Sequence, residues 1–263
     1  MDPLTSQNFL RFGLAEVRGI GLKTDDNGQV MPPLVRETTA SDEVSRVRIP
    51  TNTTWALEAW ADALGGDPTE GMKVVDIDLL GTTDDNDWGR TVTTKIRNLT
   101  ANDHIVFCYI SVGTLEPYRP DYKPKAAAWH EVMAHPDGGW SDEWYLDLTK
   151  MDQVKALMEP RFQLAEQYGC HGIEPDNIDC YDDSTCWKYQ GGAGYPSPTR
   201  GNDSESQVKA LSIEYNKWLI DQAHSRGMAI AIKNAPDLIT ALGADYDCAF
   251  VEQMEDDGTP SQW

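Results

Sequence analysis

Residues 150–179 read KMDQVKALMEPRFQLAEQYGCHGIEPDNID, and the fold follows from this stretch. Over residues 150–168 the apolar side chains recur every three or four positions, which predicts an amphipathic helix. Gly169 is the residue type that ends a helix in the left-handed conformation. A short apolar strand follows and ends in polar residues. The apolar face of the predicted helix consists of Val154, Leu157, Met158, Phe162, Ala165 and Tyr168.

The same unit recurs twice further along the chain. Ser204 begins a capping-box pattern, which predicts the start of a helix that Gly227 ends. A strand over 228–233 follows, and then a shorter helix over 236–243 leads into a strand over 248–252. Because apolar strands alternate with helices, we expect a parallel sheet that is covered on both faces. Further strands are predicted over residues 54–60, 73–78, 105–111 and 144–148.

The predicted fold class is α/β, and the architecture is a (β/α)8 TIM barrel. The strands number seven, and the strand that contains Glu252 is the last of them. Only eleven residues follow Glu252, so we expect a barrel without its eighth strand and helix in this chain. An open, doubly wound sheet is the alternative. Residues 1–50 mix glycine, proline and charge without a period, which predicts a poorly ordered N-terminal extension before a barrel domain over 51–263.

The charge of the chain limits its partners. There are 43 acidic and 22 basic residues, a formal net charge of −21, which repels nucleic acid and attracts cations. The acidic excess could equally serve solubility alone. No apolar run approaches the roughly 20 residues of a membrane span, and no signal peptide is visible at the start. Sequons at Asn52, Asn98 and Asn202 give weak support for export.

The cysteine and histidine patterns argue against a metal site. Cys180 and Cys186 bracket a short polar loop and are the best disulfide candidate, whereas Cys108 and Cys248 lie in apolar runs typical of buried thiols. No cysteine or histidine spacing resembles a zinc site. The acidic loop over 84–87 lacks the glycine and glutamate of an EF-hand. We therefore expect neither a metal nor a cofactor.

Polar residues gather at the carboxyl ends of the predicted strands, which is where barrels bind ligands. No serine or cysteine nucleophile motif is present, so carboxylates are the main candidates for catalysis. Two carboxylates that flank a glycosidic bond can hydrolyse it, and Asp176 and Glu252 end the predicted fifth and seventh strands. The other polar residues at this edge include Asp76, Asp78, Tyr109, Ser111, Glu174, Asn177, Asp179, Lys233 and Asn234.

Eight segments occur in an order that resembles glycoside hydrolase family 114, the endo-α-1,4-polygalactosaminidases. The resemblance covers about residues 54–254, and its Glu-Pro-Asp-Asn-x-Asp and Tyr-Ile-Ser-x-Gly parts are the most specific. The segments are Asp76-Ile-Asp-Leu, Cys108-Tyr-Ile-Ser-Val-Gly-Thr-Leu-Glu-Pro-Tyr-Arg-Pro-Asp121, Trp144-Tyr-Leu-Asp147, Gly172-Ile-Glu-Pro-Asp-Asn-Ile-Asp179, Tyr215-Asn-Lys-Trp218, Ala223-His224, Ile232-Lys-Asn234 and Val251-Glu-Gln253.

The resemblance implies a (β/α)8 barrel that hydrolyses α-1,4-linked galactosamine inside a polysaccharide chain. It implies Asp176 as nucleophile and Glu252 as acid/base, with the polar residues named above in the substrate cleft. A galactosamine polymer is cationic, so the acidic excess would attract it. The family further implies a secreted protein, and we expect a monomer.

Two departures from the family pattern leave alternatives open. Val251 stands where family members usually have asparagine, and 186–203 looks like an insertion. Val251 and the expected loss of the eighth strand favour a second hypothesis, an inactive carbohydrate-binding barrel or a truncated relic. A third hypothesis is a phosphatase of the haloacid-dehalogenase type, based on Asp76-x-Asp78. It is disfavoured because Leu80 stands where those enzymes need threonine or valine.

Overall fold

The computed structural model describes residues 47–50, 53–57, 71–82, 87–137, 140, 142–182, 186 and 205–251. Within them, six strands form one sheet in the order β1-β2-β3-β7-β8-β9, and every neighbouring pair is parallel. The predicted parallel α/β sheet is thus confirmed. The strands are β1 (Trp55–Leu57), β2 (Val74–Asp78), β3 (Ile105–Ser111), β7 (Gly172–Asp176), β8 (Ala229–Lys233) and β9 (Cys248–Phe250).

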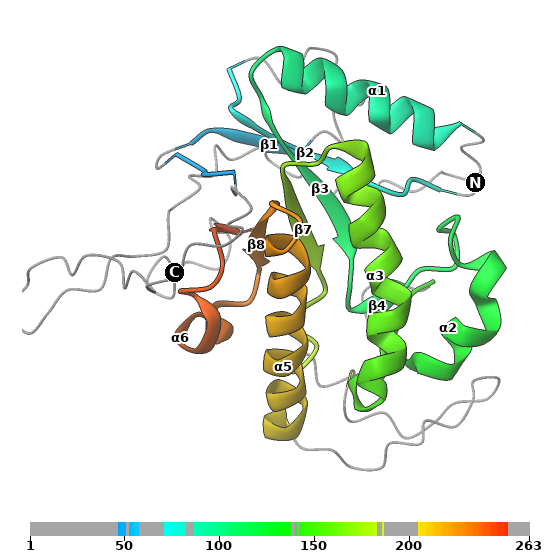
Figure 1. The fold of residues 1–263 in the computed structure, drawn as a ribbon. Coiled ribbons are helices and arrows are strands. Elements are labelled where there is room, and N and C mark those ends of the chain that lie inside the picture. Colours follow the sequence, from blue (N-terminus) through cyan, green and yellow to red (C-terminus); the bar gives the residue numbers. More distant parts are fainter. Residues whose placement is uncertain are drawn as a thin grey trace, which may run out of the picture.

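Three long helices cover one face of this sheet. Helix α3 (Met151–Tyr168) lies between α1 (Trp88–Ala101) and α5 (Glu205–His224), as Figure 1 shows. The predicted helix over 150–168 is confirmed, and Gly169 ends it in the left-handed conformation, at φ 87°. After β8, the 3₁₀ helix η4 (Pro236–Leu238) and the short α6 (Ile239–Leu242) lead into β9.

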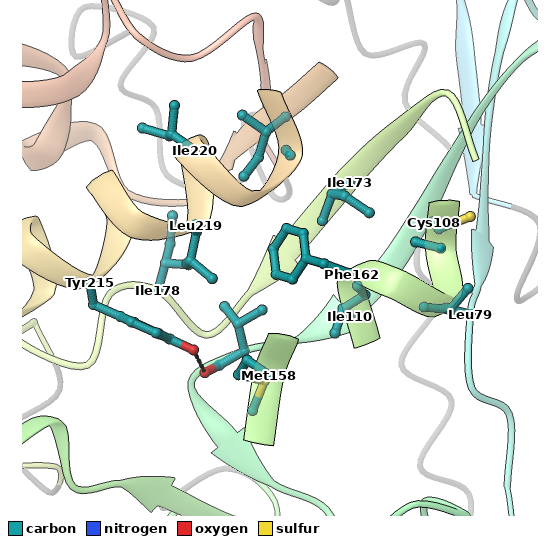
Figure 2. Packing of buried hydrophobic residues seen from close by; sticks show 14 of the residues in the cluster. Leu79, Cys108, Ile110, Met158, Phe162, Ile173, Ile178, Tyr215, Leu219 and Ile220 are labelled. Carbon is teal, nitrogen blue, oxygen red and sulfur yellow. Dashed lines mark hydrogen bonds between the residues drawn. The ribbon is translucent and has the colours of Figure 1, made fainter. Parts of the chain in front are cut away.

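The sheet is two-faced because strand side chains alternate with a period of two. The face under the helices carries Ile110, Ile173 and similar residues, which pack against Met158, Phe162 and Leu219 of α3 and α5 (Figure 2). The opposite face of the sheet is the barrel interior, and near the amino ends of the strands its side chains are apolar. That second cluster comprises Val74, Phe107, Ala229, Ala231, Cys248 and Phe250. Continuing the alternation toward the carboxyl ends brings Asp76, Tyr109, Glu174 and Lys233 to this interior face.

The strand predicted over 144–148 is not part of the barrel. Strand β6 (Trp144–Leu146) pairs antiparallel with β4 (Thr114–Leu115) and β5 (Met133–Pro136) in a separate sheet, and β3 pairs directly with β7. The prediction was wrong because β6 is only three residues long, and a short apolar run looks the same in either kind of sheet. Asp176 therefore ends the fourth parallel strand of the described residues.

The connection between β3 and α3 carries the remaining elements. They are the 3₁₀ helix η2 (Lys123–Lys125), α2 (Ala126–Val132) and the 3₁₀ helix η3 (Leu148–Lys150). The Leu146 amide donates to the Gly113 carbonyl at 2.9 Å, which fixes the small sheet against the end of β3. The small sheet thus lies at the end of the barrel where the candidate site is expected.

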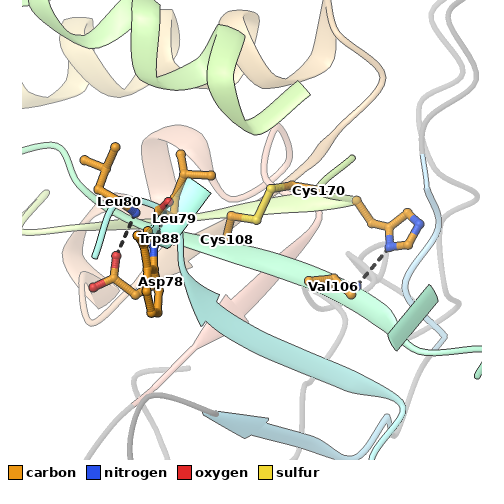
Figure 3. Close-up of a disulfide and its surroundings, with 8 residues drawn as sticks. Asp78, Leu79, Leu80, Trp88, Val106, Cys108 and Cys170 are labelled. Atoms are coloured by element: carbon orange, nitrogen blue, oxygen red, sulfur yellow. Dashed lines mark hydrogen bonds between the residues drawn. A yellow bond between two sulfur atoms is a disulfide. The ribbon is translucent and has the colours of Figure 1, made fainter. Parts of the chain in front are cut away.

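Two disulfides cross-link the chain. The predicted bond between Cys180 and Cys186 is confirmed, with Cα atoms 5.6 Å apart. Cys108, predicted as a free thiol, is instead bonded to Cys170, with Cα atoms 6.0 Å apart (Figure 3). The sequence did not reveal this pair because the two residues meet only when β3 pairs with β7. Cys248 is a buried free thiol, as predicted.

We predict that the Cys108–Cys170 bond contributes more to stability than the Cys180–Cys186 bond. It closes a loop of 62 residues rather than 6, and the entropy removed from the unfolded chain grows with loop length. The double substitution Cys108→Ala/Cys170→Ala should lower the free energy of unfolding by about 3 kcal/mol. Urea unfolding of this variant and of Cys180→Ala/Cys186→Ala measures both losses. An equal or larger loss in the second variant would contradict the prediction.

Several predictions fall partly or wholly outside the described residues. The extension predicted over 1–50 is described only from 47, and Glu252 and residues 187–203 are not described. Of the three sequons, Asn98 is exposed on α1. None of the helices in the described part of the chain is long and apolar enough to span a membrane.

Candidate active site

The centre of the candidate site is the Asp176 carboxylate at the end of β7. Its Oδ2 accepts a hydrogen bond from the Tyr109 hydroxyl at 2.9 Å, and its Oδ1 lies 3.4 Å from the Lys233 Nζ. The Lys233 ammonium also donates to Glu174 Oε1 at 2.5 Å. The Asp176 side chain keeps 24% of its surface exposed, whereas Lys233 keeps 3%. The Asp176 carboxylate is thus held by Tyr109 and Lys233 and remains partly accessible to solvent.

The phenol of Tyr109 acts as a fixed donor to this carboxylate. Burial, followed by the negative charge of Asp176, raises the pKa of Tyr109 far above its ordinary value, so the hydroxyl keeps its proton. The charged groups of Arg119 and Lys233 lie 5.7 Å and 5.9 Å from the centre of its ring. Two cations near the electron-rich ring stabilise its position.

The backbone after Asp176 is locked to the turn after β3. The Asp176 carbonyl accepts hydrogen bonds from the amides of Val112 and Gly113 at 3.1 and 3.3 Å. Asn177 has a positive φ of 61°, and its side-chain amide donates to the hydroxyls of Ser111 and Thr114. A Cβ atom at Gly113 would lie 1.6 Å from the Asn177 carbonyl oxygen, so only glycine allows this approach. The direction of the Asp176 side chain is therefore set by two strands.

A buried ion-pair network supports the β2 side of the site. The Arg119 guanidinium donates to both Glu116 oxygens, at 2.8 and 3.0 Å, and also to Asp78 Oδ2 and the Gly81 carbonyl. Asp78 Oδ1 accepts from the amides of Leu80 and Gly81, and the first of these bonds is visible in Figure 3. Every oxygen of the two carboxylates next to Arg119 thus accepts a hydrogen bond, and the guanidinium balances one of their two negative charges.

Tyr118 joins this network to a second buried acid, Glu143. The Tyr118 hydroxyl lies 2.6 Å from Glu116 Oε1 and 2.9 Å from Glu143 Oε1, but it has only one proton to donate. Thr114 donates to the other Glu143 oxygen at 3.0 Å and contacts Ser111 at 2.6 Å. Burial, and then the charge of Glu116, raises the pKa of Glu143 to about 7. A proton on Glu143 relieves the competition for the single Tyr118 hydrogen.

We predict that Glu143 destabilises the protein as pH rises. Its folded pKa of about 7 lies above the ordinary value of 4.5, so the folded state holds the proton more tightly than the unfolded state. The stability that this proton confers is complete below pH 4.5 and is lost by about pH 7. Relative to Glu143→Gln, the melting temperature of the unmodified chain should fall across this window. The exposed Glu214→Gln is the control and should give a constant difference; a constant difference for Glu143→Gln would refute the prediction.

The remaining predicted site residues occupy different depths. Asp76 and Glu174 are 0% and 1% exposed. Together with the buried Lys233 they form the bottom of the site, and we call these three residues the floor. Asp179, in the loop after β7, has its pKa raised to about 6 by burial and lies within electrostatic range of Asp176 and Lys233. Asn234, with φ 46°, donates its backbone amide to the Phe250 carbonyl at 3.1 Å and so joins the ends of β8 and β9.

The comparisons with known proteins identify the family of the chain. The family description that matches is glycoside-hydrolase family GH114, over residues 36–258. This chain belongs to family GH114. It is a glycoside hydrolase, and the resemblance deduced from the sequence is confirmed. No curated protein matches the chain significantly.

The similarity to the solved structure of Ega3 shows the barrel fold. Ega3 of Aspergillus fumigatus, in complex with galactosamine, is 23% identical, with a TM-score of 0.61 over 87% of this chain and 76% of its own. The predicted (β/α)8 fold is confirmed as a partial barrel, in place of an open doubly wound sheet. The PelA hydrolase domain of Pseudomonas aeruginosa is 12% identical, covering 68% and 59% of the two chains, with a TM-score of 0.49. An α-galactosidase of Thermus thermophilus, also 12% identical, covers 71% and 41%, with a TM-score of 0.43.

The GH114 site contains residues to which sequence reasoning assigned no role. They are Thr114, Glu116, Tyr118, Arg119 and Glu143. The first four lie in the Cys108–Asp121 segment, which carried the resemblance. The oppositely charged Glu116 and Arg119 in this segment were the available signal. Glu143 gave no signal, because it reaches Thr114 only through the separate β4–β6 sheet.

Metal ligation was also tested against the geometry of this GH114 chain. Among the described residues, no group of three or more histidine, cysteine, aspartate or glutamate side chains is arranged to hold a metal ion. Asp76, the nucleophile that a haloacid-dehalogenase reaction would need, is 0% exposed. Family membership and this burial together remove the phosphatase hypothesis.

Proposed function

We propose that this chain cleaves α-1,4-linked galactosamine polymers at internal positions, with Asp176 and Glu252 as the two catalytic carboxyls. The observation that carries the proposal is the state of Asp176. It is a partly exposed carboxylate at the carboxyl end of a strand in a glycosidase barrel. Tyr109 contacts one of its oxygens and Lys233 the other. A carboxylate held in this way can act at an anomeric carbon above it.

The proposed reaction divides between the two acids. Asp176 attacks the anomeric carbon as the glycosidic C–O bond breaks, and Glu252 donates a proton to the leaving oxygen. Water, deprotonated by Glu252, then releases the sugar from Asp176. Glu252 lies outside the described residues, two positions after Phe250, whose side chain is on the barrel interior. For this assignment, the two carboxyls should stand about 5–5.5 Å apart.

Charge and one relative support galactosamine as the sugar. The net charge of −21 creates a field that draws a polymer of ammonium-bearing sugars toward the protein. Ega3 was solved in complex with galactosamine. The buried cations of this chain do not oppose such a substrate, because Lys233 and Arg119 are each paired with carboxylates. A partly exposed Asp176 next to cations that are already paired leaves a negative charge at the open end of the barrel for a cationic sugar.

Three polymers test the proposal. The purified chain is incubated with α-1,4-polygalactosamine, its N-acetylated form and α-1,4-polygalacturonate, which has the same linkage but carries negative charge. Reducing ends should appear fastest from polygalactosamine, with oligomers as early products, and the rate should fall as salt screens the attraction. Faster cleavage of polygalacturonate would overturn the substrate. Binding of polygalactosamine without cleavage would instead select the carbohydrate-binding barrel, which Val251 beside Glu252 favours.

We further propose that the chain is exported and monomeric. Two disulfides support export, since such bonds persist mainly in oxidising compartments, and the Asn98 sequon is exposed. Thiol labelling of the protein recovered from culture medium should find one reactive cysteine only after unfolding. Sedimentation measures the oligomeric state. Labelling of several cysteines would contradict export, and a dimer mass would contradict the monomer.

A further inference from the structure

The floor of the site contains a pair of carboxyls with no conventional donors. Asp76 is on β2 and Glu174 is on β7, and β3 lies between these two strands. Both side chains are on the interior face of the sheet and are almost completely buried. Among the described residues, no N–H or O–H group reaches either oxygen of Asp76 or the Oε2 of Glu174. The two carboxyl groups lie close enough for the charge of Glu174 to raise the pKa of Asp76. If both were ionised they could not hydrogen-bond to each other, because neither would have a hydrogen to donate.

The charge balance of the floor points the same way. Two ionised carboxylates and the Lys233 ammonium would leave one uncompensated negative charge in a buried site, which is costly. One added proton makes the group of three neutral and joins two of the three unpartnered oxygens, one of Asp76 and the Oε2 of Glu174, in a hydrogen bond. Burial, and next the charge of Glu174, raises the pKa of Asp76 well above its ordinary value. Asp78, Asp176 and the buried Cys248 are the other titratable groups near this pair, and none of them supplies a positive charge.

We infer that Asp76 is a neutral carboxylic acid that donates its proton to Glu174, and that the pair positions the Lys233 ammonium beside Asp176. Glu174 then uses one oxygen to accept from Asp76 and the other to accept from Lys233, at 2.5 Å. Asp76 touches no substrate, since it has no exposed surface. It is a positioning residue that acts through Glu174 and Lys233. Because Asp76, Glu174 and Lys233 together then carry no net charge, the full negative charge of Asp176 remains at the open end of the barrel.

Infrared difference spectroscopy tests the protonation and needs no activity. At pH 7 the spectrum of the unmodified chain minus that of Asp76→Asn should contain the carbonyl stretch of one protonated carboxylic acid, whereas the contribution of Glu143, with its pKa of about 7, is common to both proteins and cancels. Asp245→Asn, at an exposed aspartate, is the control and should lose a carboxylate band instead. Loss of a carboxylate band in Asp76→Asn would overturn the inference, because Asp76 would then be ionised.

A rescue series tests the positioning. An asparagine amide can donate to Glu174 as the acid does, whereas alanine cannot. The kcat of Asp76→Asn should therefore exceed that of Asp76→Ala by about tenfold, with KM for both within about twofold of the unmodified chain. If Asp76→Ala fails to fold, Asp76→Val, which also has no donor, takes its place. Equal kcat values would overturn the positioning role. This part rests on the proposed function; an inactive unmodified chain would refute that function while the infrared result still stands.

Discussion

Asp176→Asn is expected to lower kcat/KM on polygalactosamine by at least about a thousandfold, roughly 4 kcal/mol of transition-state stabilisation. The amide is similar in shape but cannot carry the negative charge that attacks or stabilises the anomeric carbon. The fold should persist, because the amide oxygen can still accept from Tyr109 and the side chain is part-exposed. Reducing-end release, measured at equal concentrations of folded protein, gives the ratio.

Asp245→Asn is the matched control for this prediction. It removes the same charge from an exposed position after α6, so it should leave kcat/KM within about twofold. Glu252→Gln should be as inactive as Asp176→Asn. If Asp176→Asn keeps more than a tenth of the activity, Asp176 is not the catalytic carboxylate.

Lys233→Met is expected to lower the free energy of unfolding by about 3–5 kcal/mol and to abolish activity. The ammonium is 3% exposed and lies between Glu174 and Asp176, at 2.5 and 3.4 Å. Removing the cation leaves a buried carboxylate without its partner, the situation in which a buried ion pair is most costly to break. Methionine fills a similar volume, so the loss reports charge rather than a cavity. Urea unfolding monitored by circular dichroism measures it.

An exposed ion pair supplies the comparison for Lys233. Lys209 lies 3.0 Å from Asp237 on the surface, and Lys209→Met should cost no more than about 1 kcal/mol. The double variant Lys233→Met/Glu174→Gln should recover part of the stability, because it removes the orphaned charge as well. If Lys233→Met costs as little as Lys209→Met, the buried network does not depend on the ammonium.

The local patterns of the sequence predicted most of the fold. The helix over 151–168 and its end at Gly169 follow from a 3.6-residue period and a residue type with access to positive φ. The apolar strands that alternate with helices predicted the parallel sheet. The polar strand ends predicted the site, and Tyr109, Asp176 and Lys233 do meet there.

Contacts between distant segments could not be predicted in the same way. The bond between Cys108 and Cys170 depends on β3 lying beside β7, and the sequence placed Trp144–Leu146 between them. The proton shared by Asp76 and Glu174 depends on burial, which no motif encodes. Glu143 reaches the site through an antiparallel sheet whose pairing the sequence left unresolved.

The account depends most on one sugar linkage lying between Asp176 and Glu252. An experimental structure of the Asp176→Asn variant with a bound α-1,4-galactosamine oligomer measures this directly. The account predicts an anomeric carbon about 3–3.5 Å from the side chain at position 176, with the Glu252 carboxyl next to the glycosidic oxygen. An oligomer bound elsewhere on the barrel, or a Glu252 carboxyl too far from that oxygen to donate a proton, would contradict it.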